Sequence, residues 1–257
     1  MRKYFKEKAR IEMRENKMII IDAKELDFKD VNERIRRSGD DCTVTGCCGQ
    51  RFIAAGMSGK NIVIDGVPGN ALGAYLNGAK ITVNGNVQDA VGDTMNEGEI
   101  VVYGNIGDTA GYAMRGGTIF VKGNAGYRTG IHMKEYKKKM PVMVIGGTAG
   151  SFLGEYQAGG KIIVLGLNAG QKKIVGYFPC TGMHGGKIFL RSDCRDVIFP
   201  DQVEARRATP EDLTEIREYL EKYCRLFGAQ LEEVLNAPFT VVTPDTHNPY
   251  HQMYVAN

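Results

Sequence analysis

The sequence has no long apolar run, no excess of one charge sign and no export signal at its start. Its longest uninterrupted apolar runs are a few residues, far below the roughly 20 that span a bilayer, so we expect no contact with a membrane. The 33 basic and 30 acidic residues give a formal net charge of +3, which is too balanced for chain-wide nucleic-acid binding. Residues Met1 to Phe5 open a charged segment rather than a signal peptide. We therefore expect a cytoplasmic protein whose cysteines are reduced thiols.

Glycine, by contrast, is abundant, at 33 of the 257 residues. This is nearly twice the average usage of about 7%. No Gly-X-Y period is present, which excludes a collagen-like chain, and a hydrophobic content of 43% is ordinary for a folded protein. Because glycine loses the most conformational freedom on folding, its excess indicates positions where the backbone geometry requires it.

The glycines recur at a fixed spacing beside short segments of alternating apolar residues. Gly66, Gly85, Gly104 and Gly123 are 19 residues apart, and the series continues at Gly146 and Gly166. Alternation of apolar residues is typical of a strand with one buried face, and we expect the mostly polar or variable residues between them to face solvent. The expected inward pairs are Ile62/Ile64, Ile81/Val83, Ile100/Val102, Ile119/Val121, Val142/Val144, Ile162/Val164 and Ile188/Leu190.

One strand per 19 residues, with further columns in register, predicts a coil whose turns rest on one another. A second glycine column lies at Gly73, Gly92, Gly111 and Gly130, and an asparagine column at Asn86, Asn105 and Asn124 predicts a ladder of stacked amides. No six-residue sub-period of a left-handed hexapeptide coil is present. The sequence therefore predicts an all-β, single-stranded, right-handed parallel β-helix of about seven turns.

The two ends of the chain differ from the repeat, which suggests three segments. Residues 1–45 hold a short apolar strand and a helical pattern and form an N-terminal cap, and residues 46–200 form the β-helix. Residues 201–257 contain a helix that begins at Thr209-Pro210-Glu211-Asp212 and ends at Gly228. We expect this helix to cover the last layer of the coil.

Several groups that resemble reactive sites are better explained as structure. The glycine loops lead into further strands rather than a helix, so they do not match a phosphate-binding loop. Cys42, Cys47 and Cys48 lack metal-site spacing, and Pro249 interrupts the pair His247 and His251. The carboxylates Asp89, Asp93 and Asp108 fall on different columns and form no acid/base pair, and no serine nucleophile motif is present. We therefore expect no catalytic, cofactor-binding or metal-ligating residues in this chain.

One turn breaks the period with an insertion between Gly130 and Pro141 that is rich in lysine. Insertions in a solenoid usually carry its interactions, although a solvated charged loop would look the same. We expect this loop to dock on an acidic partner surface and to affect mainly the association rate. A second candidate corner contains His184 among glycines. The candidate partner-interface residues are His132, Lys134, Lys137, Lys138, Lys139 and His184.

Five motifs resemble those of the GXGXG family, and more closely the stand-alone form of the C-terminal domain of the glutamate synthase large subunit found in archaea and some bacteria. They lie at Gly46 to Ile53, Gly69 to Tyr75, Met114 to Gly117, Gly126 to Tyr136 and Gly182 to Gly186, and the resemblance covers about residues 42–245. It implies a right-handed β-helix that is mainly architectural.

The resemblance also implies partners. A glutaminase-type amidotransferase subunit would free ammonia from glutamine, and an FMN-binding synthase subunit with an iron–sulfur cluster would combine it with 2-oxoglutarate. The cofactors are expected on the synthase subunit and none in this chain. The alternatives are a scaffold like the glycine-repeat subunit of formylmethanofuran dehydrogenase, or an independent β-helix enzyme acting on a polysaccharide or ester. Whether copies of the chain also associate is left open.

Overall fold

The computed structural model describes residues 19–39 and 41–245. Eleven strands form one sheet in the order β1-β2-β3-β4-β5-β6-β7-β8-β9-β11-β10. Strands β1 to β9 are parallel, whereas β11 pairs antiparallel with both β9 and β10. The strands are β1 (Ile19–Asp22), β2 (Asp41–Cys48), β3 (Asn61–Val67), β4 (Asn77–Val83), β5 (Glu97–Val102), β6 (Gly117–Val121), β7 (Pro141–Ile145), β8 (Ala158–Val164), β9 (Gly185–Leu190), β10 (Val203–Arg207) and β11 (Thr240–Pro244). The helices are α2 (Phe28–Arg37), α3 (Pro210–Phe227) and α4 (Leu231–Leu235).

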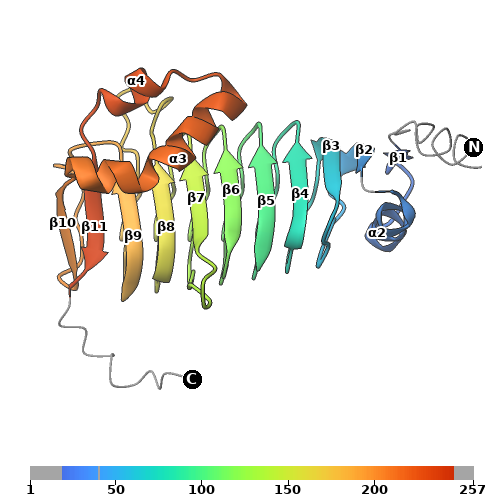
Figure 1. Ribbon diagram of the computed structural model, residues 1–257, viewed down its shortest axis with the longest axis horizontal. Helices are drawn as coiled ribbons and strands as arrows, with labels where there is room; N and C mark the ends of the chain where they lie inside the picture. Colours follow the sequence, from blue (N-terminus) through green and yellow to red (C-terminus); the bar gives the residue numbers. More distant parts are fainter. Residues whose placement is uncertain (1–18, 40, 246–257) are drawn as a thin grey trace, which may run out of the picture.

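The predicted coil is confirmed. Ile81 pairs with Ile100, and Ile100 with Ile119, so the 19-residue spacing is the register of the sheet. In Figure 1 the chain climbs each strand on the near side and steps from right to left with every turn, which is the sense of a right-handed coil. The expected inward residues of β3, β4, β5 and β6 are at most 1% exposed and form one core that runs along the axis.

The outer face of the sheet differs from the expectation of polar residues. From β5 onward the residues between the inward positions are themselves apolar and buried, among them Val101, Phe120 and Phe189. They pack against Ile216, Leu220 and other residues of α3 and α4. The C-terminal half of the sheet is therefore covered on both faces.

Strand β7 shows what this second buried face does to the sequence pattern. Val142 and Val144 were expected to face inward, and this is wrong, because both lie in the cluster under α3. Met143 and Ile145 take the inward positions instead, paired with Ile119 and Val121 of β6. All five residues of β7 are buried, so apolar character alone could not distinguish its two faces.

Two groups of charges attach α3 to the sheet. Glu99 accepts from Lys80 of the neighbouring strand at 3.2 Å and also pairs with Lys222 of α3. Glu215 of α3 pairs with Lys161 at 3.1 Å and with Lys187 at 2.6 Å. Although burial opposes ionisation, the lysines lower the pKa of both carboxyl groups. The helix is thus held by ion pairs at two points along the sheet as well as by apolar packing.

The helix α3 begins and ends as the sequence predicts, but it does not cover the last layer. Thr209 and Asp212 form a reciprocal capping box, and Gly228 ends the helix with a left-handed φ of 74°. Figure 1 shows α3 lying across the outer face of the coil, while β10 and β11 stand at its end. The expectation that the helix covers the open end of the coil is wrong, because its apolar stripe packs on the apolar outer face of β5 to β9 and of β11.

At the other end, α2 caps the first turn as expected. The buried side chain of Asn32 accepts from Ala54 N at 2.8 Å and donates to Phe52 O at 2.9 Å. In later turns the equivalent N–H binds a carbonyl of the preceding turn, for example Gly73 N to Ile53 O. The Asn32 side chain therefore supplies the first turn with hydrogen bonds that a preceding turn would otherwise make. Strand β2 pairs in parallel with β3 and crosses the expected boundary between residues 45 and 46.

Each turn contains three left-handed residues at alternate positions. In one turn these are Ala90, Gly92 and Thr94, with φ of 58°, 66° and 52°. Ala90 N and Thr94 N donate to the following turn, and Gly92 N donates to Leu72 O of the preceding turn. Only the middle residue faces the core, where a Cβ on Gly92 would lie 2.6 Å from Ile119 Cδ1. This explains the second glycine column, although Ala54 and Cys180 hold the same position in the first and last turns.

The asparagine column is confirmed as a ladder, and a second ladder lies beside it. Asn86 Oδ1 accepts from Asn105 N at 2.8 Å, and Asn105 Oδ1 accepts from Asn124 N at 2.8 Å. Asp89 Oδ1 likewise accepts from Asp108 N at 2.9 Å. Placing Asp89 and Asp108 on different columns was wrong, because they are 19 residues apart and share one. Their carboxylates accept hydrogen bonds from backbone N–H groups of the next turn and so stabilise the stacking of the turns.

The left-handed columns predict different outcomes for substitutions at two positions of the same turn. Gly92→Ala adds a strained φ and a core contact, so the free energy of unfolding should fall by about 1–3 kcal/mol. Ala90→Gly relieves strain at an outward position but adds freedom to the unfolded chain, so the change should stay within about 1 kcal/mol. Urea unfolding followed by circular dichroism checks both values. Equal losses in the two variants would contradict the assigned geometry.

The capping box of α3 predicts a pH-dependent contribution from Asp212. Its hydrogen bond to Arg206 lowers the pKa of the buried carboxyl from 3.8 to about 2. A lowered pKa contributes stability above the unfolded value, and this is lost as the pH falls through the folded value. Asp212→Asn should therefore cost about 1–2 kcal/mol in unfolding free energy at pH 7. The difference from wild type should shrink between pH 4 and pH 2; a difference independent of pH over that range would contradict the assignment.

Candidate interaction surface

The predicted lysine insertion is a short ordered loop with a fixed base. Tyr136 and Lys139 exchange two backbone hydrogen bonds of 3.1 and 3.0 Å, and Lys139 Nζ lies 2.7 Å from Glu97 Oε2. Glu135 Oε1 accepts from Gly160 N at 3.0 Å, which ties the loop to the next strand. Lys134, Lys137 and Lys138 are exposed. Of the predicted lysines, Lys139 has a structural ion pair and Lys137 Nζ lies over the Tyr136 ring at 5.3 Å, while no ion pair among the described residues involves Lys134, Lys137 or Lys138.

Of the two candidate histidines, His132 contacts Tyr156 directly, and His184 comes two residues after Gly182, which packs on the same ring. His132 occupies an outward left-handed position, and its ring stacks on Tyr156 with a centroid distance of 5.2 Å and an angle of 9°. The His132 ring also meets the edge of Tyr112 at 5.8 Å. Gly182 packs so closely on Tyr156 that a Cβ there would lie 2.4 Å from the ring, and Gly182 O is 3.0 Å from His184 Nδ1. Tyr156 therefore contacts one candidate corner through the His132 ring and the other through Gly182.

A second aromatic cluster occupies the other outward column of the left-handed segments, beside the first. The Arg128 guanidinium lies over the Phe152 ring at 4.9 Å, and Phe152 stacks on Phe178 at 5.5 Å. Arg128 also pairs with Glu155, whose backbone O accepts from His132 N. Sequence reasoning missed these residues, although several occupy the outward columns that flank the glycine column. We call this surface the aromatic face; it comprises Tyr112, Arg128, His132, Phe152, Tyr156, Tyr177 and Phe178.

The aromatic face ends in a shallow apolar groove of about 330 Å³. One wall comes from the last turn and the other from the segment after β9. Exposure is high for its outer side chains, at 72% for Tyr177 and 88% for Ile198. We call it the apolar groove; the ion pair between Lys173 and Asp196 also lines it, and its apolar lining is Ala149, Val175, Tyr177, Phe178, Pro179, Val197 and Ile198.

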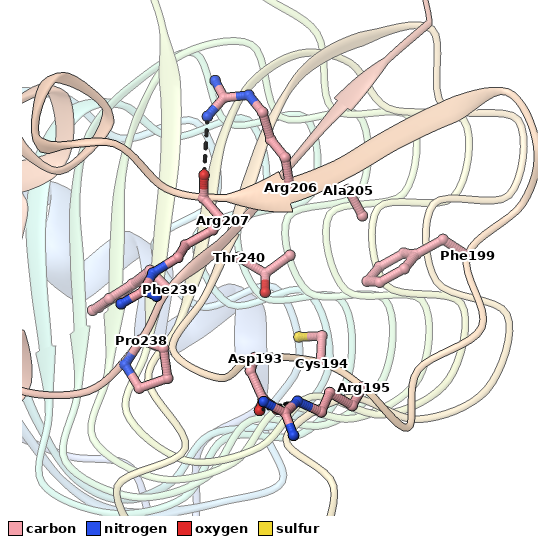
Figure 2. Close-up of a pocket in the computed structure, with 10 residues that line it drawn as sticks. All are labelled: Asp193, Cys194, Arg195, Phe199, Ala205, Arg206, Arg207, Pro238, Phe239 and Thr240. Carbon is pink, nitrogen blue, oxygen red and sulfur yellow. Dashed lines mark hydrogen bonds and ion pairs between the residues drawn. The ribbon is translucent and has the colours of Figure 1, made fainter.

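Figure 2 shows a separate cavity of about 360 Å³ between the segment after β9 and the strands β10 and β11. Its charges are largely compensated, because Arg195 pairs with Asp193 at 2.8 Å and Arg206 with Asp212 at 2.6 Å. Burial raises the pKa of the Cys194 thiol, which keeps it protonated and a poor nucleophile. The arrangement favours a structural role for this cavity rather than acid/base or thiolate chemistry.

The remaining thiols also behave as small apolar groups. Five of the six cysteines are buried and Cys48 is exposed. Burial raises the pKa of Cys47 to about 11 and that of Cys180 to about 12. Within residues 19–39 and 41–245 no cluster of three or more His, Cys, Asp or Glu side chains could hold a metal ion. The pair His247 and His251 lies outside the described residues.

Comparison with known proteins agrees with this architecture. None of the described helices has the length and apolar character needed to cross a membrane. The chain is 41% identical over 250 residues to an uncharacterised protein of Methanocaldococcus jannaschii, with 92% of this chain and 96% of the relative covered. Its fold is similar to a chain in the crystal structure of the formyltransferase/hydrolase complex from Methylorubrum extorquens with bound methylofuran. The TM-score is 0.60 at 23% identity, over 79% of this chain and 72% of that one.

A family match covers nearly the whole sequence, from residue 13 to residue 245. It extends further toward the N-terminus than the motifs that carry the resemblance, and it includes α2, the coil and α3. The chain belongs to the GXGXG motif family.

Proposed function

We propose that this protein is a structural subunit of a multi-subunit enzyme complex in the cytoplasm. The observation that carries the proposal is the aromatic face, because a monomeric protein rarely exposes a contiguous apolar surface of this kind without a use for it. The described residues support a binding role over a catalytic one: the buried thiols are held neutral, and Asp89 and Asp108 are used by the backbone of the coil.

The complex that we favour is of the glutamate synthase type. The resemblance of the five motifs supports it. The helix from Thr209 to Gly228 followed by the segment from Pro238 to Pro244 also resembles the glutamate synthase branch better than the formylmethanofuran dehydrogenase subunit; these ranges contain α3 and β11. In such a complex an amidotransferase subunit hydrolyses glutamine to glutamate and ammonia. A synthase subunit with FMN and an iron–sulfur cluster condenses ammonia with 2-oxoglutarate and reduces the imine by two electrons to a second glutamate. This chain would hold the two subunits and take no part in the chemistry.

A second candidate is a scaffold of the kind expected for the glycine-repeat subunit of formylmethanofuran dehydrogenase. It is favoured by the fold similarity to a chain of the formyltransferase/hydrolase complex. In this case the partners would act on a formyl group carried by a furan cofactor. An independent β-helix enzyme acting on a polysaccharide or ester is a third hypothesis, which turnover by the isolated chain would establish.

The glutamate synthase proposal predicts which proteins co-purify with this chain from its native cells. An affinity-tagged chain should co-purify with a protein that shows flavin and iron–sulfur absorbance and with a glutaminase-type subunit. The preparation should form glutamate from glutamine and 2-oxoglutarate when a reductant is supplied, and the chain expressed alone should not. Recovery of formyl-transfer activity instead would support the second candidate, and recovery of a lone monomer would contradict both.

A further inference from the structure

We propose that the aromatic face and the apolar groove bind the acidic surface of a partner subunit, which places an apolar side chain in the groove. The inference rests on the proposed function, namely that the chain works within a complex. It identifies the side of the coil that binds the partner and the chemistry of the partner's contacting surface.

The sides of the coil differ in how much of their apolar surface is covered. The outer face of β5 to β9 is sealed by α3 and α4, so its apolar residues are buried within this chain. The aromatic face lies on the connections between strands, on the left-handed segments, and none of its residues belongs to the cluster under α3. Along the C-terminal half of the coil, this side therefore carries the exposed aromatic surface.

The side chains of that surface are of the kind that protein interfaces use. Tyr156, Phe178, Tyr177 and Ile198 are 46%, 64%, 72% and 88% exposed. Tyrosine and arginine dominate the energetic centres of protein interfaces, because they bury large areas at a small cost in conformational entropy. The rings here are already stacked on one another and held on a rigid coil, so little further ordering is required on binding. A concave apolar end beside rigid aromatic rings fits one protruding apolar side chain.

Uncompensated positive charge borders the same surface. Arg128, Lys139 and Lys173 are compensated by Glu155, Glu97 and Asp196. Within the described part of the chain no ion pair involves the exposed residues Lys134, Lys137, Lys138 or Lys172. These lysines border the aromatic face at the insertion and at the last turn. A partner with carboxylates opposite these lysines associates faster and binds more tightly.

Negative charge on earlier turns limits where the partner sits along the axis. One to two turns before Arg128, the same side of the coil carries Asp89, Asp93 and Asp108. Thr94 Oγ1 donates to Asp93 Oδ1, and no basic side chain is paired with these carboxylates among the described residues. An acidic partner is repelled there and attracted by the lysines, so it docks on the C-terminal half of the coil.

Two variants and two matched controls test the surface. Ile198→Asp places a charge in the apolar groove at a side chain that is exposed enough to leave folding intact. The double variant Lys137→Glu/Lys138→Glu reverses two charges at the tip of the insertion. The controls are Ile20→Asp, at a position that is 67% exposed on β1, and Lys24→Glu, also at the N-terminal end. Unchanged melting temperatures confirm that each variant folds.

The readout is the amount of partner recovered per mole of tagged chain from native cells, after washing at 0.1 M and 0.5 M salt. Ile198→Asp should reduce recovery at least about fivefold at both salt concentrations, since the loss is one of apolar contact. The lysine double variant should reduce it by about threefold or more at 0.1 M salt, and its ratio to wild type should approach one at 0.5 M. The controls should stay within about 1.5-fold of wild type, which is the scatter expected for remote surface changes.

Carbodiimide cross-linking of the wild-type complex then identifies the contact, because this reagent joins lysine amines directly to carboxylates. Links from Lys134, Lys137 or Lys138 to aspartates or glutamates of the partner support the proposal. Links only from lysines of β4 or α3, or full recovery with both variants, overturn it. A recovered partner that is lost with the variants but is neither a flavin-containing subunit nor a glutaminase would refute the glutamate synthase assignment while supporting this surface. Links between two copies of this chain would show self-association and overturn the assignment to a different subunit.

Discussion

The structure depends on the hydrogen bonding of the left-handed segment in each turn. Three alternate residues with positive φ turn successive N–H groups toward opposite neighbours, so each inner turn is bonded both forward and backward along the axis. Non-glycine residues in this conformation cost about 1 kcal/mol each, and they persist because unbonded buried N–H groups would cost more. The 19-residue register, the glycine column and the continuous core all follow from this constraint.

The same constraint determines which positions are available for recognition. The middle residue of each triplet points at the core, where Ile100, Ile119 or Ile162 leaves almost no space for a side chain. The outer two point away and accept arginine, histidine, tyrosine or phenylalanine. His132 and Tyr156 meet because they occupy one outward column in adjacent turns, and Arg128, Phe152 and Phe178 meet for the same reason. A rigid coil thus sets side chains from distant parts of the sequence at a regular spacing on one surface.

Much of the fold was predictable because the repeat uses residues with few alternatives. The inward isoleucine and valine pairs of β3 to β6, the asparagine column and the capped helix at Thr209 each rest on one local rule, and each was confirmed. The placement of α3 was not predictable in the same way. The apolar character of Val101, Phe120 and Phe189 was interpreted as variation within a strand rather than as a second buried face, and the same second face led to the wrong assignment of Val142 and Val144.

The interaction surface was foreseen only in part. His132, His184 and the lysines stood out by charge and by the broken period. Tyr156 and Phe152 were missed because their outward direction depends on a backbone conformation that the sequence does not announce for residues other than glycine. The shared column of Asp89 and Asp108, in contrast, could have been found by counting residues.

Centrally, we propose that this member of the GXGXG motif family acts by holding a partner against the C-terminal half of its coil. The most direct test is a cryo-electron microscopy structure of the complex purified from native cells. We expect density for another subunit over Arg128, Tyr156 and the apolar groove, with carboxylates opposite the lysine insertion and a side chain beside Ile198. A complex in which that side faces solvent while a partner contacts only the N-terminal turns or α3 would contradict the proposal.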